Sequence, residues 1–491
     1  MTTGKKVYLA VDLGAESGRV LAGVYDGKKL ILEEMARFPT GGVHLPDGWH
    51  WDIVRILGDI RSGIAKARAE FGDAVVSVSV DTWGVDYGLL DARGSLLGVP
   101  WMYRDSRTDG MMDAVSALVP PPELYRRTGL QPMFFNTIYQ LRAETGRNPD
   151  VVKNASRIAF MPDLLTYWLS GQTTVERTIA STSGLLKAGT AEWDEELAAR
   201  LGIPGHILPP VSEPCTVVGP LLDESGNPGG IKVVLCGSHD TASAVAGVPA
   251  AEKNPLFLSS GTWSLLGREL DAALVTDATG AANFSNEQGL FGTTRLLKNV
   301  AGMWLLQECK RNWEREGEKL DYGSLVAKAA GTEAGQILDP DAPEFSRPCD
   351  MPAAIAAWLQ KTGQSAPAGR AATTRIILES LALKYRTLLR QMKSWMPDFP
   401  ETLHIVGGGS RNALLNQMTA DASGLRVTAG PSEATAAGNI AAQMIACGDL
   451  SNLAEARALI RASFEIAEFV PRESAPWDEK EARFATLAPS L

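Results

Sequence analysis

The sequence predicts an α/β protein of two domains. Its 491 residues exceed what one hydrophobic core usually serves. Short β-branched runs alternate with longer helical patterns along the whole chain, which is typical of α/β folds. This pattern starts again near residue 255, so we place the boundary between Pro249 and Lys253. The expected domains are residues 1–248 and 249–491.

The first half opens with three consecutive apolar runs that predict strands, at 6–14, 18–26 and 29–38. Strands that follow one another this closely favour an antiparallel meander. Helical spacing over 52–71 then precedes a buried strand at 74–81, and a further strand at 231–240 ends on a polar turn. The run GVPWMY, residues 98–103, also has the character of a strand.

The second half repeats this opening with a strand pair over 255–270, joined at a Gly-Thr turn. A long amphipathic helix is predicted over 373–393, and the strand LHIVGGG follows at 403–409. The two halves therefore begin alike, as expected of two related domains.

Composition narrows the classes of function. The formal net charge of −10 argues against nucleic-acid or anionic-membrane partners, both of which need a basic surface. The first apolar run, 7–11, is too short for a signal segment, and no run is long enough to span a bilayer. Five scattered cysteines without CxxC spacing fit reduced thiols, so we expect a cytoplasmic protein.

The segment DLGAESGR, residues 12–19, forms a turn between two predicted strands. Gly14 and Gly18 would let backbone amides approach a phosphate, and Ser17 and Arg19 can donate to it. Asp12 is placed to hold a metal-bound water. An ordinary hairpin turn explains the segment equally well on its own. The chain has no GxxxxGK[ST], GxGxxG before a helix or GxSxG, which disfavours P-loop, Rossmann and α/β-hydrolase enzymes.

Residues 79–91, SVDTWGVDYGLLD, place a tryptophan and carboxylates after a strand. An aromatic ring beside carboxylates suits a sugar, whose C–H face packs on the ring while its hydroxyls form directed hydrogen bonds. A hairpin whose Trp83 belongs to the core is an equally good interpretation. In the following YRDSRT, a surface salt-bridge cluster is the first interpretation of Arg107.

The segment GSHDTAS, residues 237–243, lies between a strand and a helix of small residues. Asp240 can simply cap that helix, an interaction that contributes ~1 kcal/mol. The functional alternative is a carboxylate that acts on a ligand close to the domain boundary.

Two small-residue turns occur in the second half. SSGTWS, residues 259–264, opens that half as DLGAESGR opens the first. In IVGGGSRNALLNQ, residues 405–417, a strand meets three glycines and then a helix, so a ligand can lie against bare backbone at the helix N-terminus.

The order of these motifs resembles the FGGY carbohydrate kinases, which belong to the actin-like ATPase superfamily. The resemblance covers roughly Val7 to Leu450. Blocks such as DTWGVDYGLLD, MPDLLTYWLSG, SHDTASAVAG, LSSGTWSLLG and HIVGGGSRNALLNQ are most similar to family members that act on L-rhamnulose. The resemblance implies two ribonuclease H-like domains with a ligand cleft between them, the second holding most of the ATP.

The resemblance also implies roles for individual residues. Asp240 would be the general base, and Asp12 would lie near Mg²⁺, bound through water. The implied nucleotide residues are Ala15, Glu16, Ser17, Gly18, Arg19, Thr262, Gln307 and Gly408. The implied sugar residues are Gly84, His239, Asp240, Thr241 and Asn299. The expected reaction is ATP-dependent phosphorylation of L-rhamnulose at O1.

The sequence departs from the family pattern at one place, and three alternative functions remain open. Many relatives carry threonine or serine at the positions of Ala15 and Glu16, and Glu16 adds negative charge beside the predicted phosphate loop. The same kinase could act on L-fuculose, L-xylulose or another ketose. An actin-like ATPase that switches a protein partner would not need Asp240, and a silent sugar-binding module would not need Asp12, Asp240 and the triple glycine together. The oligomeric state is left open.

Overall fold

The computed structural model describes residues 4–317, 319–472 and 475–487. Its contacts divide the chain into two compact units. The first comprises Met1–Asn254, Glu269–Leu297 and Ala434–Phe464, and the second comprises Pro255–Arg268, Lys298–Glu433 and Glu465–Leu491. The prediction of an α/β chain is confirmed. The domain ranges drawn from the sequence remain a prediction, and the return of 269–297 and 434–464 to the first unit was not anticipated.

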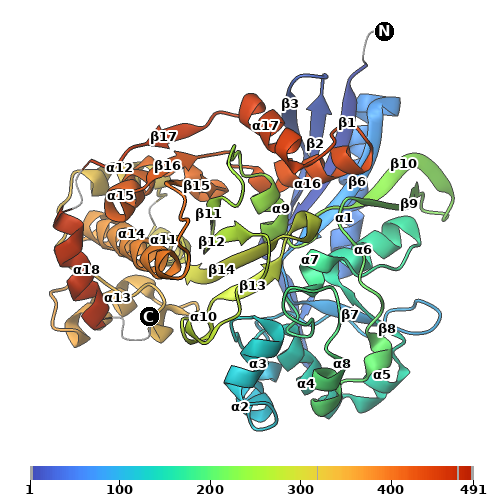
Figure 1. The fold of residues 1–491 in the computed structure, drawn as a ribbon, viewed down its shortest axis with the longest axis horizontal. Coiled ribbons are helices and arrows are strands. Elements are labelled where there is room, and N and C mark those ends of the chain that lie inside the picture. The colour runs from blue at the N-terminus through green and yellow to red at the C-terminus, as the bar shows by residue number, and fades with distance from the viewer. Residues whose placement is uncertain (1–3, 318, 473–474, 488–491) are drawn as a thin grey trace. The chain divides into compact units, whose positions relative to one another are not determined.

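The first unit is built on a six-stranded sheet in the order β3-β2-β1-β6-β10-β9 (Figure 1). Its strands are β1 (Lys6–Leu13), β2 (Ser17–Tyr25), β3 (Leu30–Pro39), β6 (Val75–Thr82), β9 (Thr216–Leu222) and β10 (Pro228–Leu235). The first three form the predicted antiparallel meander. Strands β6 and β10 then run parallel to β1, so the carboxyl ends of β1, β6 and β10 point the same way.

Strand β1 is apolar throughout because both of its faces are covered. Val7, Leu9 and Val11 share one core with α1 (Ile53–Phe71). The alternate residues Tyr8 and Ala10 pack in a second core with α16 (Ala434–Ala446). Successive side chains of a strand point to opposite faces, so a strand covered on both sides reads as a continuous apolar run.

The remaining elements of the first unit surround this sheet. Its small strands are β4 (Gly42–Leu45), β5 (Gly48–Trp51), β7 (Tyr87–Leu90), β8 (Arg157–Phe160) and β13 (Ser285–Gln288), which pairs with the first part of β14 (Thr294–Ala301). Its further helices are α2 (Met111–Ser116), α3 (Pro121–Thr128), α4 (Thr137–Arg147), α5 (Pro149–Asn154), α6 (Met161–Ser170), α7 (Arg177–Ala180), α8 (Glu195–Arg200), α9 (Asp240–Ala246), α10 (Asp277–Ala281) and α17 (Leu453–Ser463).

The strands of the second unit pair in a similar way. They belong to a seven-stranded sheet in the order β13-β14-β12-β11-β15-β16-β17, with β11 (Leu256–Ser260), β12 (Trp263–Leu270), β15 (Thr402–Val406), β16 (Arg426–Ala429) and β17 (Ala467–Phe469). Strand β11 is antiparallel to β12 and parallel to β15, which is parallel to β16. In both sheets the first strand, β1 or β11, therefore lies between an antiparallel second strand, β2 or β12, and a later parallel strand, β6 or β15.

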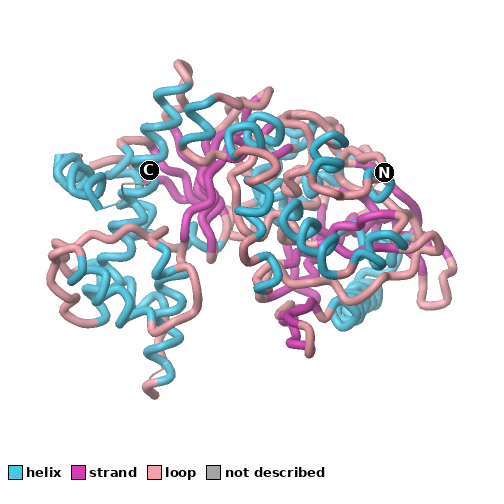
Figure 2. The backbone as a smooth tube through the Cα atoms, turned by 90° about the horizontal axis from the view of Figure 1, so that it is seen from below, coloured by secondary structure: helices cyan, strands magenta, loops and turns pink. Residues whose placement is uncertain are grey.

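Helices flank the strands throughout (cyan and magenta in Figure 2). Those of the second unit are α11 (Trp304–Arg315), α12 (Tyr322–Ala330), α13 (Met351–Lys361), α14 (Arg370–Trp395), α15 (Ala413–Ser423) and α18 (Ala475–Leu487). Within the described ranges, no helix combines the length and the apolar character needed to cross a membrane.

The predicted strands and helices are largely observed, with one clear error. The segment 98–103 is not a strand, and only Trp101 makes an isolated bridge, to His50. Its apolar side chains contact a distant part of the chain. Trp101, for example, stacks on His50 with ring centroids 4.0 Å apart. Local β propensity was thus overridden by the packing of side chains from elsewhere in the chain.

Candidate active site

Three aspartates meet at the carboxyl ends of parallel strands in the first unit. Asp12 ends β1, Asp81 ends β6 as its aligned partner, and Asp240 follows β10. The turn before Asp240 is joined to β6, because Thr82 N donates to Ser238 O at 2.9 Å. Ligands of α/β sheets bind outside the carboxyl ends of such strands. This edge of the sheet is therefore the candidate active site.

Asp12 is paired directly with Arg19, the residue opposite it in the β1–β2 hairpin. Arg19 Nη2 lies 2.6 Å from Asp12 Oδ2, and both side chains are largely shielded from solvent. The structure therefore gives Arg19 a protein partner in addition to its predicted role at the phosphates.

The predicted phosphate turn is closed by backbone hydrogen bonds. Gly14 N donates to Ser17 O at 3.0 Å, and Thr40 N donates to Glu16 O at 3.2 Å. Glu16 and Ser17 are exposed, and Ala15 is half-buried. The glycine at position 18 is explained without a ligand, because a Cβ there would lie 2.6 Å from side-chain atoms of Leu13 and Phe38. Packing thus requires glycine at position 18.

Asp81 is the residue of this site that the sequence analysis missed. It is fully buried and accepts a hydrogen bond from Asn439 Nδ2 at 2.6 Å, while its Oδ1 has no hydrogen-bond partner among the described residues. Burial, and next the charge of Asp12, raise the pKa of Asp81 well above its ordinary value, and Asp240 adds to this. The signal in the sequence was the strand ending VSVD, which matches LAVD at Asp12.

Asp240 is the first residue of α9, and the N-cap position is His239, whose side chain makes no capping hydrogen bond. The Asp240 side chain is 33 % exposed and accepts a hydrogen bond from Thr241 Oγ1 at 3.1 Å. Burial raises the pKa of Asp240, while the neighbouring His239 lowers it. The carboxylate is therefore open to a ligand and surrounded by protein, which suits a base better than a cap.

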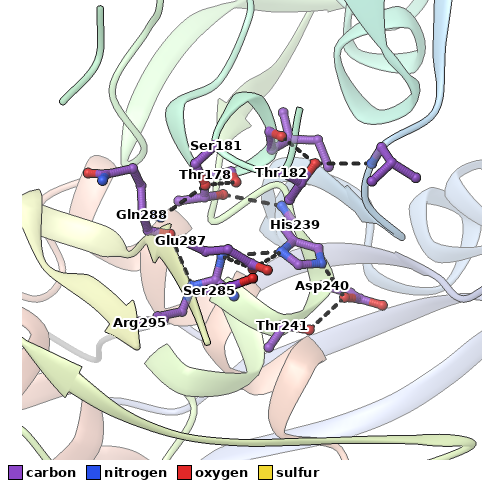
Figure 3. A network of polar contacts seen from close by, with 12 residues as sticks. Thr178, Ser181, Thr182, His239, Asp240, Thr241, Ser285, Glu287, Gln288 and Arg295 are labelled. Atoms are coloured by element: carbon purple, nitrogen blue, oxygen red, sulfur yellow. Dashed lines mark hydrogen bonds and ion pairs between the residues drawn. The ribbon is translucent and has the colours of Figure 1, made fainter. Parts of the chain in front are cut away.

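His239 contacts charged groups on both edges of its ring (Figure 3). Nε2 lies 3.4 Å from Asp240 Oδ1. On the other edge, Nδ1 lies 3.2 Å from Arg295 Nη2 and 3.2 Å from Glu287 Oε2. Arg295 and Glu287 are themselves 3.1 Å apart and buried. Burial opposes ionisation of Glu287, but Arg295 and His239 together outweigh it and the pKa of Glu287 is lowered.

A second buried carboxylate fixes the turn that carries Asp240. Glu176 Oε2 accepts hydrogen bonds from Thr178 Oγ1 at 2.6 Å and from Ser238 N at 3.1 Å, and His239 N donates to Thr178 Oγ1 at 3.2 Å. Burial raises the pKa of Glu176 to about 7. Neither Glu176 nor the Glu287–Arg295 pair has a local sequence signature, because their contacts with the turn at Ser238 and His239 join positions that are far apart in the chain.

The interpretation of Trp83 and Asp86 as sugar-facing is not supported. Trp83 is 6 % exposed and stacks on Trp51 with ring centroids 4.0 Å apart. Both indole N–H groups donate to Asp86 Oδ2, at 2.6 Å from Trp51 and 3.0 Å from Trp83, and Gln140 donates to Oδ1 at 2.9 Å. Burial raises the pKa of Asp86 to about 6. The alternative of a core tryptophan fits these contacts.

Gly84 lies directly beside this aromatic pair. A Cβ there would lie 3.2 Å from Thr182 Oγ1, which accepts a hydrogen bond from Val85 N at 3.0 Å. Thr82, two residues earlier, bridges His239, so Gly84 belongs to the same edge of the sheet as Asp240. Gly84 thus follows the strand end that bridges His239, the neighbour of Asp240 and Thr241, and its role in sugar binding stays a prediction.

Arg107 is buried, contrary to the first interpretation of it as a surface residue. Its Nη1 lies 3.1 Å from Glu144 Oε2, and its Nη2 donates to Gln140 Oε1 at 2.6 Å. The charged composition of YRDSRT favoured a surface cluster, but this guanidinium supports the Gln140 side chain that in turn contacts Asp86.

Thr262, Gln307, Gly408 and Asn299 belong to the second unit. The β11–β12 turn is tied to the start of α11, since Trp304 N donates to Thr262 O at 3.1 Å, and Gln307 lies one turn further along that helix. Gln307 Oε1 is buried and has no hydrogen-bond partner in the described part of the chain. Asn299 is half-buried in β14.

The triple glycine follows β15, which is parallel to β11. Ser260, at the end of β11, lies against it, because side chains on Gly407 and Gly409 would collide with the Ser260 backbone and hydroxyl. Gly408 faces open space. The predicted close approach of bare backbone is therefore available at Gly408, next to the Ser260–Thr262 turn.

The chain is similar to known proteins over most of its length. The profile of the FGGY family of carbohydrate kinases matches over residues 7–247 for its N-terminal domain and 256–447 for its C-terminal domain. A rhamnulokinase from Bacteroides thetaiotaomicron is 41 % identical over 478 residues, covering 96 % of this chain and 98 % of that protein.

The chain belongs to the FGGY family of carbohydrate kinases.

Solved structures of family members have the same fold. A gluconate kinase from Lactobacillus acidophilus superposes with a TM-score of 0.81 at 16 % identity, covering 99 % of this chain and 98 % of that one. A xylulose kinase from Rhodospirillum rubrum gives 0.80 at 19 % identity, with 99 % of both chains covered. As a member of this family the chain is an ATP-dependent sugar kinase.

Proposed function

We propose that this kinase phosphorylates L-rhamnulose at O1, with Asp240 as the general base. The substrate rests on the relative named a rhamnulokinase, which spans nearly the whole chain at 41 % identity. The base rests on one observation: Asp240 is a partly exposed carboxylate beside His239 and Thr241 whose pKa is raised by burial. A raised pKa brings a carboxylate closer to the pKa that proton transfer near neutral pH requires.

In the proposed reaction, Asp240 accepts the proton of the attacking hydroxyl as its oxygen bonds to the γ-phosphorus of ATP. The bond between that phosphorus and the β,γ-bridging oxygen breaks, and ADP leaves. The acceptor hydroxyl is held beside Gly84, His239 and Thr241, the residues gathered at this edge of the sheet. Phosphoryl transfer needs alignment and charge neutralisation more than covalent assistance from the enzyme. Asn299 is the further sugar contact that we propose in the second unit.

The proposed nucleotide residues are the turn from Ala15 to Arg19 in the first unit and Thr262, Gln307 and Gly408 in the second. The exposed residues Glu16 and Ser17 and the open space at Gly408 support a contact with phosphate oxygens. The buried Gln307 Oε1, which lacks a partner among the described residues, supports a polar ligand beside α11.

The carboxylates fit a Mg²⁺ ion that arrives with the nucleotide. Within the described ranges, no group of three or more His, Cys, Asp or Glu residues is arranged to hold a metal ion by itself. Mg²⁺ commonly takes only one or two carboxylates, together with waters and substrate phosphates. Asp12, and Asp81 with its unpartnered Oδ1, would orient water bound to the metal. The ion would offset negative charge on the phosphates.

Substrate choice is tested by ADP release across a panel of ketoses. L-Rhamnulose should give the highest kcat/KM, and ketoses that differ at one hydroxyl should lose about tenfold or more, since an unpaired buried polar group costs ~1–3 kcal/mol. Higher efficiency with L-fuculose or L-xylulose would replace the substrate. ATP hydrolysis that does not depend on any ketose would instead favour the actin-like switch.

The proposal extends to the cellular setting. Free cysteines at all five positions fit a reducing compartment, and we place the enzyme in the cytoplasm with ATP and a small ketose as its partners. No nucleic-acid or membrane partner is part of the proposal.

A further inference from the structure

The imidazole of His239 lies between the proposed base and a buried ion pair. One ring nitrogen, Nε2, faces Asp240 Oδ1 at 3.4 Å, and the other, Nδ1, faces Arg295 and Glu287 (Figure 3). All four residues belong to the first unit. The protonation of this ring decides whether Asp240 faces an N–H group, a lone pair or a cation.

The contact with Arg295 restricts that protonation. A guanidinium carries only donors and stays protonated in proteins. Arg295 Nη2 lies 3.2 Å from His239 Nδ1 in hydrogen-bonding geometry, so Nδ1 must supply a lone pair. The remaining proton of a neutral imidazole then belongs to Nε2, the nitrogen that faces Asp240. A doubly protonated ring would direct Nδ1–H at a donor.

Several carboxylates oppose this assignment and have to be weighed. Asp240 and Glu287 both lie within 3.4 Å of the ring and favour an imidazolium. Glu287, however, is already paired with Arg295 at 3.1 Å. The 3.2 Å contact of Glu287 Oε2 with His239 Nδ1 is an ion-pair distance that lacks hydrogen-bond geometry, and it contributes to the lowered pKa of Glu287. Burial lowers the pKa of Arg295, and the charges of Glu287, Asp240, Glu176 and Glu269 oppose this and favour its protonated form.

Arg295 is also fixed in place. Its side chain is fully buried, and Nε donates to Gln288 O at 3.0 Å in the same β13–β14 hairpin. Gln288 N in turn donates to Ser181 Oγ at 2.9 Å, which ties the hairpin to the end of α7. The donor that faces His239 therefore cannot turn away without breaking contacts in the core.

We propose that Arg295 is a positioning residue that keeps His239 neutral and protonated at Nε2, so that this N–H faces Asp240 Oδ1. Its catalytic meaning rests on the proposed function of Asp240. The N–H group faces Oδ1 at 3.4 Å, and Thr241 Oγ1 donates to the same oxygen at 3.1 Å, which leaves Oδ2 as the oxygen that accepts the proton of the sugar hydroxyl. Arg295 touches neither substrate nor nucleotide in this scheme and acts only through His239.

The first test measures the ring directly and needs no activity. The chain has five histidines, so nitrogen-15 labelling of histidine gives a small set of imidazole signals, and His239→Gln identifies the one of interest. Near neutral pH we expect His239 to carry one proton, on Nε2, with Nδ1 unprotonated. A doubly protonated ring, or a single proton on Nδ1, would overturn the proposal.

The second test removes the ion pair as a whole. In Arg295→Gln with Glu287→Gln no buried charge is left unpaired, which would otherwise endanger folding. We expect the His239 signal to lose its fixed Nε2–H form and kcat to fall about 10- to 100-fold, as for a slightly misplaced catalytic group, with the KM for ATP little changed. A folded double variant with wild-type tautomer and kcat would also overturn the proposal. If this variant does not fold, the wild-type measurement decides alone.

A matched control is available in the same unit. Arg107 and Glu144 form another buried pair, 3.1 Å apart, that does not touch His239 or Arg295. The double variant Arg107→Gln with Glu144→Gln should lose comparable stability and keep both the His239 tautomer and kcat. Wild-type enzyme without ketose kinase activity would refute the proposed function, and the tautomer measurement would still test the role of Arg295.

Discussion

Asp12 and Asp81 are aligned partners at the ends of the parallel strands β1 and β6, and their carboxylates are stabilised differently. Asp12 pairs with Arg19, whereas Asp81 is fully buried with Asn439 as its donor. The charge of Asp12 contributes to the raised pKa of Asp81. Two neighbouring carboxylates, one paired and one not, are suited to a site that receives a positively charged ligand.

Asp240→Asn should separate the base from a structural role. Asparagine keeps the size of the side chain and removes the proton acceptor, so kcat should fall by ~10²–10⁴ if Asp240 is the general base. Coupled ADP-release assays measure this effect. The N-cap residue of α9 is His239 and not Asp240. The melting temperature of the variant should therefore stay near wild type, and it serves as the control. Activity within a few-fold of wild type would refute the assignment.

Asp12→Ala should change the response to magnesium. Removing this carboxylate takes away a group proposed to orient metal-bound water and leaves Arg19 without its 2.6 Å partner. We expect lower turnover and a higher Mg²⁺ requirement, with the affinity for the sugar nearly intact. A magnesium titration of initial rates measures the first two, and calorimetric titration with ketose alone measures the third. Identical magnesium curves for both proteins would rule the role out.

Glu176→Gln should alter the pH dependence of stability. Burial raises the pKa of Glu176 from 4.5 to about 7, so the folded protein binds more protons than the unfolded chain between these values. The free energy of unfolding of the wild type therefore falls, through this group, as pH rises from about 4.5 to about 7.

Glutamine does not titrate, and it loses an acceptor for buried donors, which costs ~1–3 kcal/mol. The variant should be less stable than the wild type at the acidic end of this window, and the difference should shrink as pH rises. Denaturant unfolding at several pH values measures it. Parallel stability curves would contradict the assigned pKa.

Gly438→Ala should destabilise the first unit, because a methyl group at position 438 of α16 would collide with Ser243 O of α9. Overpacking of this kind typically costs ~1–3 kcal/mol. Gly58→Ala is the matched control: Gly58 lies in the interior of α1 with open space around its Cα, so alanine should raise stability by ~0.5–1 kcal/mol. Thermal unfolding compares the two. Equal effects would show that α9 and α16 can move apart without loss.

The sequence predicted those parts of the fold that are local. Strand β1, the meander and α1 follow from apolar periodicity, and Asp12 and Asp240 were found because each follows such a strand. The boundary strands around 255–270 were found in the same way. These elements are encoded by neighbouring residues, so a short window of sequence contains their signal.

The parts that were missed depend on contacts between distant positions. Glu176 holds the Ser238 backbone, 62 positions later, and Arg295 meets His239, 56 positions earlier. Arg107 was assigned to the surface because its neighbours are polar, but its partner Glu144 comes from another helix. Trp83 was left open between sugar and core, because its hydrogen bond to Asp86 and its stacking on Trp51 leave no trace in local composition.

The late return of residues 434–464 to the first unit has a consequence for biosynthesis. Helix α16 supplies Ala436, Ile440 and Met444 to the core on one face of β1 and β2. During translation that face has no cover until the ribosome has made α16, at Ala434–Ala446. Until then, β1 and β2 of the nascent chain expose an apolar face. We expect chaperones to bind this face before α16 covers it. Truncation before residue 434 leaves the same surface bare for good.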